Sequence, residues 1–187
     1  KHGGANRQVL AQFSLIKQTV RDWKDDDAVA DCVGRILRRE LGDGSGLIYG
    51  MGHAVYTLSD PRTVILRQSA RTLAAQRGML DELELMEAVE RVTPRMFAEI
   101  TGHEKVMCAN VDMYSGLIYQ MLDIPPDLFT PLFAVARITG WCAHRMEEVL
   151  TGGRLYRPAY KSLTRHREYV PMAARTYRKN PLPAEKR

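Results

Sequence analysis

The sequence is poor in cysteine and has no long apolar run. Its three cysteines, Cys32, Cys108 and Cys142, lie far apart, and no two of them have the spacing of a zinc site. An odd, scattered set argues against a disulfide framework and is typical of a reducing compartment. No stretch approaches the roughly 20 apolar residues of a membrane span, and no signal peptide is visible. The chain itself therefore predicts no membrane partner, while any targeting segment would lie upstream of Lys1.

The sequence also lacks an excess of charge outside its tail. The net charge is +5, but residues 161–187 alone hold eight Lys or Arg against two Glu. The rest of the chain holds 19 basic and 20 acidic residues, so it is almost neutral. A basic tail of this kind is more typical of a solvated segment than of a nucleic-acid-binding protein. We therefore expect no nucleic-acid partner.

Alternation of apolar and polar residues, the mark of a half-buried strand, is missing as well. Apolar residues recur instead at steps of three and four, as at Val9, Phe13, Ile16 and Val20. The same spacing predicts further helices over residues 29–41, 61–77, 80–93, 112–122 and 127–151. The sequence therefore predicts an all-α fold.

Capping residues mark several helix boundaries. Asp60 before Pro61 is typical of a helix start, with the carboxylate as the cap and proline at the first helical position. Gly78 and the pair Gly152–Gly153 are typical of helix ends.

Two segments interrupt the helical pattern, residues 42–56 (GDGSGLIYGMGHAVY) and residues 102–112 (GHEKVMCANVD). The first contains five glycines, which let a backbone approach a ligand closely and adopt dihedral angles closed to other residues. Loops between packed helices are where binding and catalytic groups usually lie. We expect the chemistry of this protein in these two segments.

Three side chains in or near loops could carry that chemistry. His2 and His53 are flanked by glycine, although a loop histidine is more often structural than catalytic. Asp112 precedes the apolar face of a helix, so it is either a helix cap, the commoner role, or a general base. No two histidines have the i, i+4 spacing of a helical metal site, and we expect no metal.

Three arginines are candidates for binding an anion. Arg62 lies in the first turn of a helix, where the helix dipole disfavours a cation. Arg137 lies in an apolar stretch, and a buried guanidinium there would need a structural carboxylate or an anionic ligand. Arg157, which precedes Pro158, is less constrained by the sequence.

Five segments together resemble the citrate synthase family in residue identity, order and spacing. They are HGGAN at 2–6, GMGHAVY at 50–56 with DPR at 60–62, NVDMYSG at 110–116, FAVARITGWCAH at 133–144 and RP at 157–158. The resemblance covers about residues 1–160 and implies the all-α, multi-helical fold of the family. It implies a hinge with the catalytic histidine at 1–7, a small CoA-binding domain at 8–116 and the C-terminal part of the large domain at 117–187.

The resemblance also implies roles for these residues. His2 matches the histidine that stabilises the enol of acetyl-CoA, and Asp112 matches the base that takes its methyl proton. His53 matches the histidine that polarises the ketone of oxaloacetate. Arg62 and Arg137 match arginines that hold the oxaloacetate carboxylates.

Two further implications concern the partner subunit and CoA. Arg157 matches a carboxylate-binding arginine that reaches in from the other subunit of a homodimer. The segment from Leu47 to His53 matches the backbone that recognises the adenine of CoA. The expected CoA-contacting residues are Leu47, Ile48, Tyr49, Gly50, Met51, Gly52 and Asn110. Ala54 and Thr57 depart from the family, because many relatives have basic residues there that can meet CoA phosphates.

The implied reaction condenses acetyl-CoA and oxaloacetate with water to give citrate and CoA. It needs no permanently bound cofactor, since acetyl-CoA is a substrate and CoA a product. The implied location is the bacterial cytoplasm, or the mitochondrial matrix in a eukaryote. Two alternatives stay open: a 2-methylcitrate synthase that uses propionyl-CoA, and a non-catalytic helical subunit of the same fold.

Overall fold

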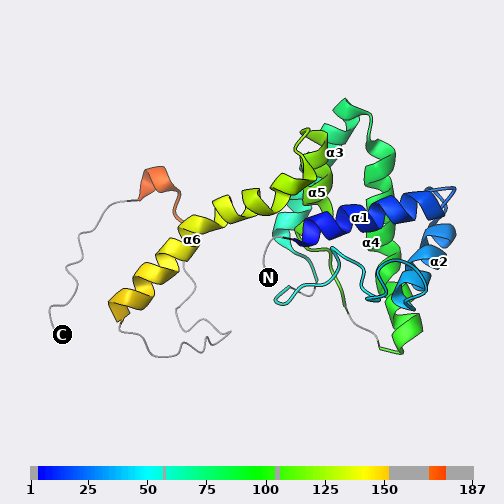
Figure 1. Ribbon diagram of the computed structural model, residues 1–187. Helices are drawn as coiled ribbons and strands as arrows, with labels where there is room; N and C mark the ends of the chain where they lie inside the picture. Colours follow the sequence, from blue (N-terminus) through cyan, green and yellow to red (C-terminus); the bar gives the residue numbers. More distant parts are fainter. Residues whose placement is uncertain (1–3, 57, 104–105, 152–168, 176–187) are drawn as a thin grey trace. The chain divides into compact units, whose positions relative to one another are not determined.

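The computed structural model describes residues 4–56, 58–103, 106–151 and 169–175. The chain divides into two units, Lys1–His144 and Arg145–Arg187. The described residues form α1 (Ala5–Thr19), α2 (Asp26–Leu37), α3 (Pro61–Arg77), α4 (Leu80–Thr101), α5 (Asp112–Met121), η1 (Pro126–Leu128), α6 (Phe129–Thr151) and η2 (Met172–Ala174) (Figure 1). Within these residues no strand is present, so the predicted all-α fold is confirmed. The domain limits expected at residues 7 and 116 stay predictions.

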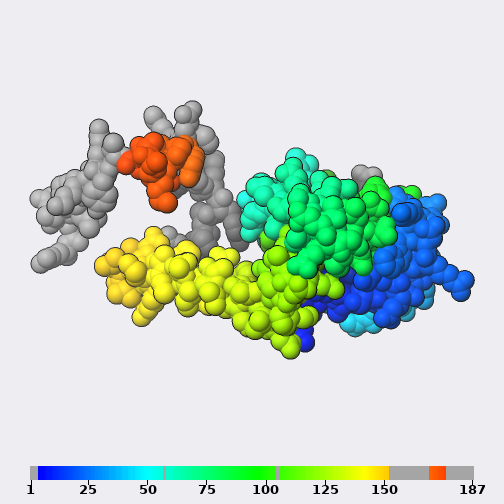
Figure 2. Space-filling model, turned by 90° about the horizontal axis from the view of Figure 1, so that it is seen from above, coloured from blue at the N-terminus to red at the C-terminus, as the bar shows by residue number. Residues whose placement is uncertain are grey.

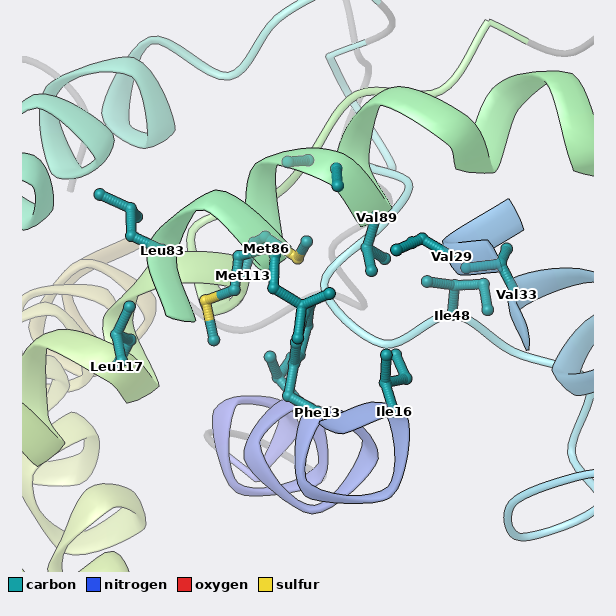
Figure 3. Packing of buried hydrophobic residues seen from close by; sticks show 14 of the residues in the cluster. Phe13, Ile16, Val29, Val33, Ile48, Leu83, Met86, Val89, Met113 and Leu117 are labelled. Carbon is teal, nitrogen blue, oxygen red and sulfur yellow. The ribbon is translucent and has the colours of Figure 1, made fainter. Parts of the chain in front are cut away.

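The core of the first unit is built where α1 packs on α5 and α2 packs on α4. Figure 3 shows side chains from these four helices meeting, among them Phe13 of α1, Val33 of α2 and Met113 of α5. Ile48 comes from the glycine-rich loop and is only 6% exposed. Burying a side chain of this size stabilises the fold by about 1.5–3 kcal/mol, so the loop is anchored in the core.

α3 packs on both α5 and α4. Figure 2 shows one face of the unit, on which the teal surface of α3 and the green surface of α4 adjoin the blue surface of α1 and α2. No helix among the described residues is both long enough and apolar enough to cross a membrane.

Most predicted helix boundaries agree with the structure, and two are wrong. The helix predicted over residues 29–41 ends at Leu37. Asp60 caps α3 by accepting the N–H of Arg62 at 3.0 Å, and Gly78 ends α3 at a φ of 68°. The end predicted at residue 93 is wrong, because α4 continues through Pro94 to Thr101. Proline removes one helical hydrogen bond. Beyond it, Met96 still packs against α2, and this contact favours continuing the helix.

α1 and α5 approach each other closely at Gly116. A Cβ atom on Gly116 would lie 3.0 Å from Cγ of Leu10 and 3.1 Å from the carbonyl oxygen of Asn6. Both distances are shorter than ordinary contacts, so a larger residue would push the two helices apart. This packing fixes the start of α5, and with it Asp112, relative to α1.

Candidate functional site

The two segments that interrupt the helical pattern lie side by side. Met51 and Ala109 form an isolated antiparallel bridge. On either side of it, the N–H of Gly52 donates to the carbonyl of Cys108 and the N–H of Asn110 donates to the carbonyl of Gly50, both at 2.8 Å. The residues expected to carry chemistry are therefore joined backbone to backbone.

Gly50 brings the first segment directly onto the start of α5. Its φ is 88°, and a Cβ atom there would lie 2.7 Å from Sδ and 2.9 Å from Cα of Met113. Only glycine combines this dihedral angle with this contact. The close approach places the segment one residue away from Asp112.

The side chain of Asn110 ties the same two elements together. Its Nδ2 donates to the carbonyl of Gly52 at 3.0 Å, and its Oδ1 accepts the N–H of Asp112 at 3.0 Å. Asn110 therefore caps the first N–H of α5. The cap alternative for Asp112 is wrong, since Asp112 is the first residue inside the helix and Val111 at the N-cap position makes no side-chain cap.

The carboxylate of Asp112 is thus released from a structural role. Within the described part of the chain, its oxygens make no hydrogen bond or ion pair. Burial raises the pKa of Asp112, and the positive charge of Arg62 opposes that rise without cancelling it. A half-buried carboxylate with a raised pKa is suited to accepting a proton.

Asp60, Arg62 and His53 form a second cluster. The buried carboxylate of Asp60 accepts hydrogen bonds from Nε of Arg62 at 3.0 Å and from Nη2 at 2.8 Å. These hydrogen bonds lower the pKa of Asp60 and hold the Arg62 fork in place. They also offset the unfavourable position of a cation in the first helical turn.

The hydrogen bonds of His53 define its tautomer. Its Nδ1 accepts the backbone N–H groups of Val55 at 2.9 Å and Tyr56 at 3.0 Å. A ring nitrogen that accepts two hydrogen bonds carries no proton, so the ring proton of the neutral imidazole lies on Nε2. Nε2 lies 3.6 Å from Oδ2 of Asp60 and 3.3 Å from Nη2 of Arg62.

This cluster can act on a small anion that also carries a carbonyl group. His53 Nε2–H and Arg62 Nη2 are both donors that face Oδ2 of Asp60, at 3.6 Å and 2.8 Å, and an acceptor oxygen of a ligand would be shared between them in the same way. Arg62 is 55% exposed in its side chain, so a ligand can reach it from solvent. Among the described residues, no three His, Cys, Asp or Glu side chains are grouped to hold a metal ion.

The structure also shows a site residue that the sequence analysis missed. Gln12 of α1 donates from Nε2 to the carbonyl of Leu47 at 2.8 Å, and its Oε1 accepts the N–H of Tyr49 at 3.0 Å. The available signal was a polar residue within the apolar stripe of Val9 and Ile16. The sequence could show that Gln12 is buried, but not which segment it binds.

The remaining candidates are placed differently. Arg137 is exposed in α6, and its guanidinium lies 5.5 Å from the ring centre of Phe133. Arg137 is not a buried guanidinium in this structure, because the apolar stretch around it is itself largely exposed, and its role in binding oxaloacetate stays a prediction. His2 and Arg157 lie outside the described residues, so the convergence of His2 with His53 and Asp112 stays a prediction.

Comparisons with known proteins agree on one family. The family model described as citrate synthase, C-terminal domain, matches residues 1–159. A citrate synthase of Synechocystis sp. is 40% identical over 177 residues, which are 93% of this chain and 40% of that protein. A 2-methylcitrate synthase of Shewanella oneidensis is 33% identical over 177 residues, or 93% of this chain and 41% of that protein.

Solved structures show the same similarity. A ternary complex of citrate synthase from Thermoplasma acidophilum with carboxymethyl coenzyme A and oxaloacetate superimposes with a TM-score of 0.62 at 30% identity. The match covers 93% of this chain and 42% of that one. The citrate synthase of Thermotoga maritima gives a TM-score of 0.60 at 29% identity, over 94% and 43% of the two chains. The chain thus spans about two fifths of the length of these relatives.

Proposed function

The chain belongs to the citrate synthase family, and from this we propose that the intact protein condenses acetyl-CoA with oxaloacetate and water to give citrate and CoA. The observation that carries the proposal is the carboxylate of Asp112. It is half-buried, its pKa is raised by burial, and no described side chain binds it. Burying a carboxylate without a partner lowers the stability of the protein, and such a group is typical of an active site that needs a general base.

In the proposed reaction the two clusters act on different substrates. Asp112 takes a proton from the methyl group of acetyl-CoA, and the electrons of that C–H bond pass into the enol. His2, as the resemblance implies, donates a hydrogen bond to the enol oxygen. The methyl carbon then bonds to the ketone carbon of oxaloacetate, while the ketone oxygen gains a proton. Water finally cleaves the thioester and releases the CoA thiol.

The cluster of His53 and Arg62 suits oxaloacetate in this scheme. Oxaloacetate is a dianion with a ketone, and the planar fork of arginine matches a carboxylate. A donor hydrogen on Nε2 of His53 would polarise the ketone by binding the oxygen on which charge develops. Asp60 already binds Nε and Nη2 of Arg62, so in this scheme the oxaloacetate carboxylate binds on the Nη1 side of the guanidinium.

The rest of the site is proposed to come from α6 and from parts of the protein outside the described residues. α6 exposes large apolar side chains, among them Val135 at 69% and Ile138 at 50%. Exposed apolar surface of this kind marks interaction sites. We propose that α6 packs against the rest of a large domain, that Arg137 joins the oxaloacetate site there, and that Arg157 serves the partner's site in a cytoplasmic homodimer.

A 2-methylcitrate synthase is the second candidate, favoured by the 33% identical relative of that name. Propionyl-CoA has one methylene more than acetyl-CoA, and such a difference is worth only about 1–3 kcal/mol in a pocket. The test is kcat/KM of the purified intact protein with each acyl-CoA and oxaloacetate. We expect the higher value with acetyl-CoA. Preference for propionyl-CoA would support the second candidate, and no turnover with either would support a non-catalytic subunit.

A further inference from the structure

Gln12 holds one edge of the segment expected to bind CoA. Its side-chain amide binds the carbonyl of Leu47 and the N–H of Tyr49 at the same time. Gln12 is 7% exposed as a residue and comes from α1, far from this segment in the sequence. A buried amide left without partners costs about 1–3 kcal/mol, so both hydrogen bonds are needed where Gln12 stands.

Two other contacts hold the same segment, and neither replaces Gln12. The hydroxyl of Tyr49 donates to Oδ2 of Asp43 at 2.6 Å. Hydrogen bonds from Ser45 and Tyr49 lower the pKa of Asp43 to about 2, so this acceptor stays ionised. Asn110 holds the far end of the segment through Gly50 and Gly52. The Ser45 hydroxyl accepts the N–H of Leu47 at 3.2 Å, but among the described side chains only Gln12 binds both the Leu47 carbonyl and the Tyr49 N–H.

These contacts divide the backbone groups of the segment into two sets. Leu47 C=O and Tyr49 N–H are taken by Gln12, and Gly50 C=O is taken by Asn110. Within the described part of the chain, the N–H of Ile48, the C=O of Tyr49, the N–H of Gly50 and the C=O of Met51 have no hydrogen-bond partner. Ile48 and Gly50 are buried, whereas Tyr49 and Met51 are half-buried, so the two free carbonyls are the groups that can accept hydrogen bonds from the amino group of a planar heterocyclic base.

We propose that Gln12 is a positioning residue for the nucleotide end of CoA. This inference rests on the proposed function and goes beyond it, since it assigns the placement of the CoA segment to one side chain of α1. Gln12 fixes the backbone on both sides of Ile48 and thereby fixes where the free carbonyl of Tyr49 lies. Its loss should weaken CoA binding and leave the oxaloacetate site, built around Asp60, unchanged.

The test uses two variants of the intact protein, Gln12→Leu and Gln12→Glu. Gln12→Leu removes both hydrogen bonds, while Gln12→Glu keeps an acceptor for Tyr49 N–H and loses the donor to Leu47 C=O. We expect Gln12→Leu to raise the Kd of CoA, measured by calorimetry, on the order of tenfold. KM for acetyl-CoA should rise with it, while KM for oxaloacetate stays constant. Gln12→Glu should have a smaller effect, and it serves as the readout if Gln12→Leu does not fold.

Hydrogen exchange separates positioning from general loss of stability. The Tyr49 amide should exchange faster in Gln12→Leu than in the parent protein and remain protected in Gln12→Glu. Thr93→Val is the matched control, because it removes a buried 2.6 Å side-chain hydrogen bond to the Val89 carbonyl in α4. It should leave CoA affinity and Tyr49 exchange unchanged.

Unchanged CoA affinity in a Gln12→Leu protein whose Tyr49 amide exchanges faster overturns the proposal, as does unchanged exchange at Tyr49. A fall in oxaloacetate affinity equal to that for CoA also overturns it, because the effect would then be general. A parent protein that binds no CoA at all contradicts the proposed function instead. The exchange measurement then still decides whether Gln12 holds the segment.

Discussion

The backbone N–H of Asn110 donates a 2.8 Å hydrogen bond to the carbonyl of Gly50. This bond joins two segments that are separated in the sequence by α3 and α4. On one side of it lies the segment that leads to His53, and on the other lies the start of α5 with Asp112. A shift of either segment is therefore transmitted to the other, and the two clusters of the site are held in a fixed relative position.

Gly50→Ala should destabilise the protein more than Gly52→Ala. The two glycines have nearly the same φ, 88° and 87°, so both variants incur the cost of a left-handed residue, about 1–2 kcal/mol. Only at Gly50 does the new Cβ meet Met113, and forced overpacking adds about 1–3 kcal/mol. Urea unfolding of both variants measures the difference. Equal free energies of unfolding would show that the contact relaxes at no cost.

The helices could be predicted from the sequence because their signals are local. Asp60, Pro61 and Gly78 act on neighbouring residues, and the bounds of α3 follow from them. The continuation of α4 through Pro94 could not be predicted, because it depends on packing against α2.

The site could be predicted only in its parts. His53, Arg62 and Asp112 stand out by their neighbours in the sequence. In the structure, Arg62 lies near enough to Asp112 for its positive charge to oppose the rise in the pKa of Asp112. What joins the parts is a bridge between Met51 and Ala109. Pairing of distant backbone segments leaves no local pattern, so it could not be predicted from the residues themselves.

Asn110→Ala should reduce both stability and activity. The variant loses the cap on Asp112 N–H, which is worth about 0.5–2 kcal/mol, and also the hydrogen bond to Gly52. Asp25→Ala is the matched control, since Asp25 caps α2 by accepting N–H groups of Asp27 and Ala28. Both variants should lose similar stability in urea unfolding. Only Asn110→Ala should lower kcat/KM, and an equal loss of kcat/KM in Asp25→Ala would remove the special role of Asn110.

Asp112→Asn should reduce turnover strongly, on the order of a hundredfold or more for the loss of a general base. The amide has nearly the same shape but cannot take the methyl proton, so the Kd of oxaloacetate should change little. Asp127→Asn is a suitable control, because Asp127 is an exposed carboxylate paired with Arg7 at 3.2 Å. Near-normal steady-state turnover of purified Asp112→Asn would reject the assignment of Asp112 as the base.

Mixing two inactive variants tests whether Arg157 acts across a dimer. Pro158 favours an extended backbone at residue 157, which lets its side chain project away. If each subunit completes the other's site, a dimer of one Arg157→Ala subunit and one Asp112→Asn subunit has one site with both defects and one with neither. About half of the normal activity should then return. Heterodimers that form, as shown by mass spectrometry, and stay inactive would place Arg157 in its own subunit's site.

The opposite pKa shifts of Asp112 and Asp60 predict opposite effects of pH on stability. The pKa of Asp112 is raised in the folded protein, mainly by burial, so folding becomes less favourable at this residue as pH rises from 3.8 through the raised pKa. The pKa of Asp60 is lowered, mainly by hydrogen bonds from Arg62, so its contribution is present above pH 3.8 and lost as pH falls through the lowered pKa.

Urea unfolding of Asp112→Asn and Asp60→Asn over a pH series measures these contributions. Relative to the parent protein, Asp112→Asn should gain stability as pH rises through the raised pKa, because the cost of a buried charge is gone. Asp60→Asn should be less stable than the parent protein above pH 3.8, because Arg62 loses its charged partner. This difference should shrink as pH falls through the lowered pKa of Asp60. The acid limb of kcat/KM, which reports groups of the free enzyme, should lie above pH 3.8, because a protonated Asp112 cannot act as a base. If the stability difference between Asp112→Asn and the parent protein does not vary with pH, then folding does not disfavour the ionised carboxylate of Asp112. The physical reason for choosing Asp112 as the base would then be lost.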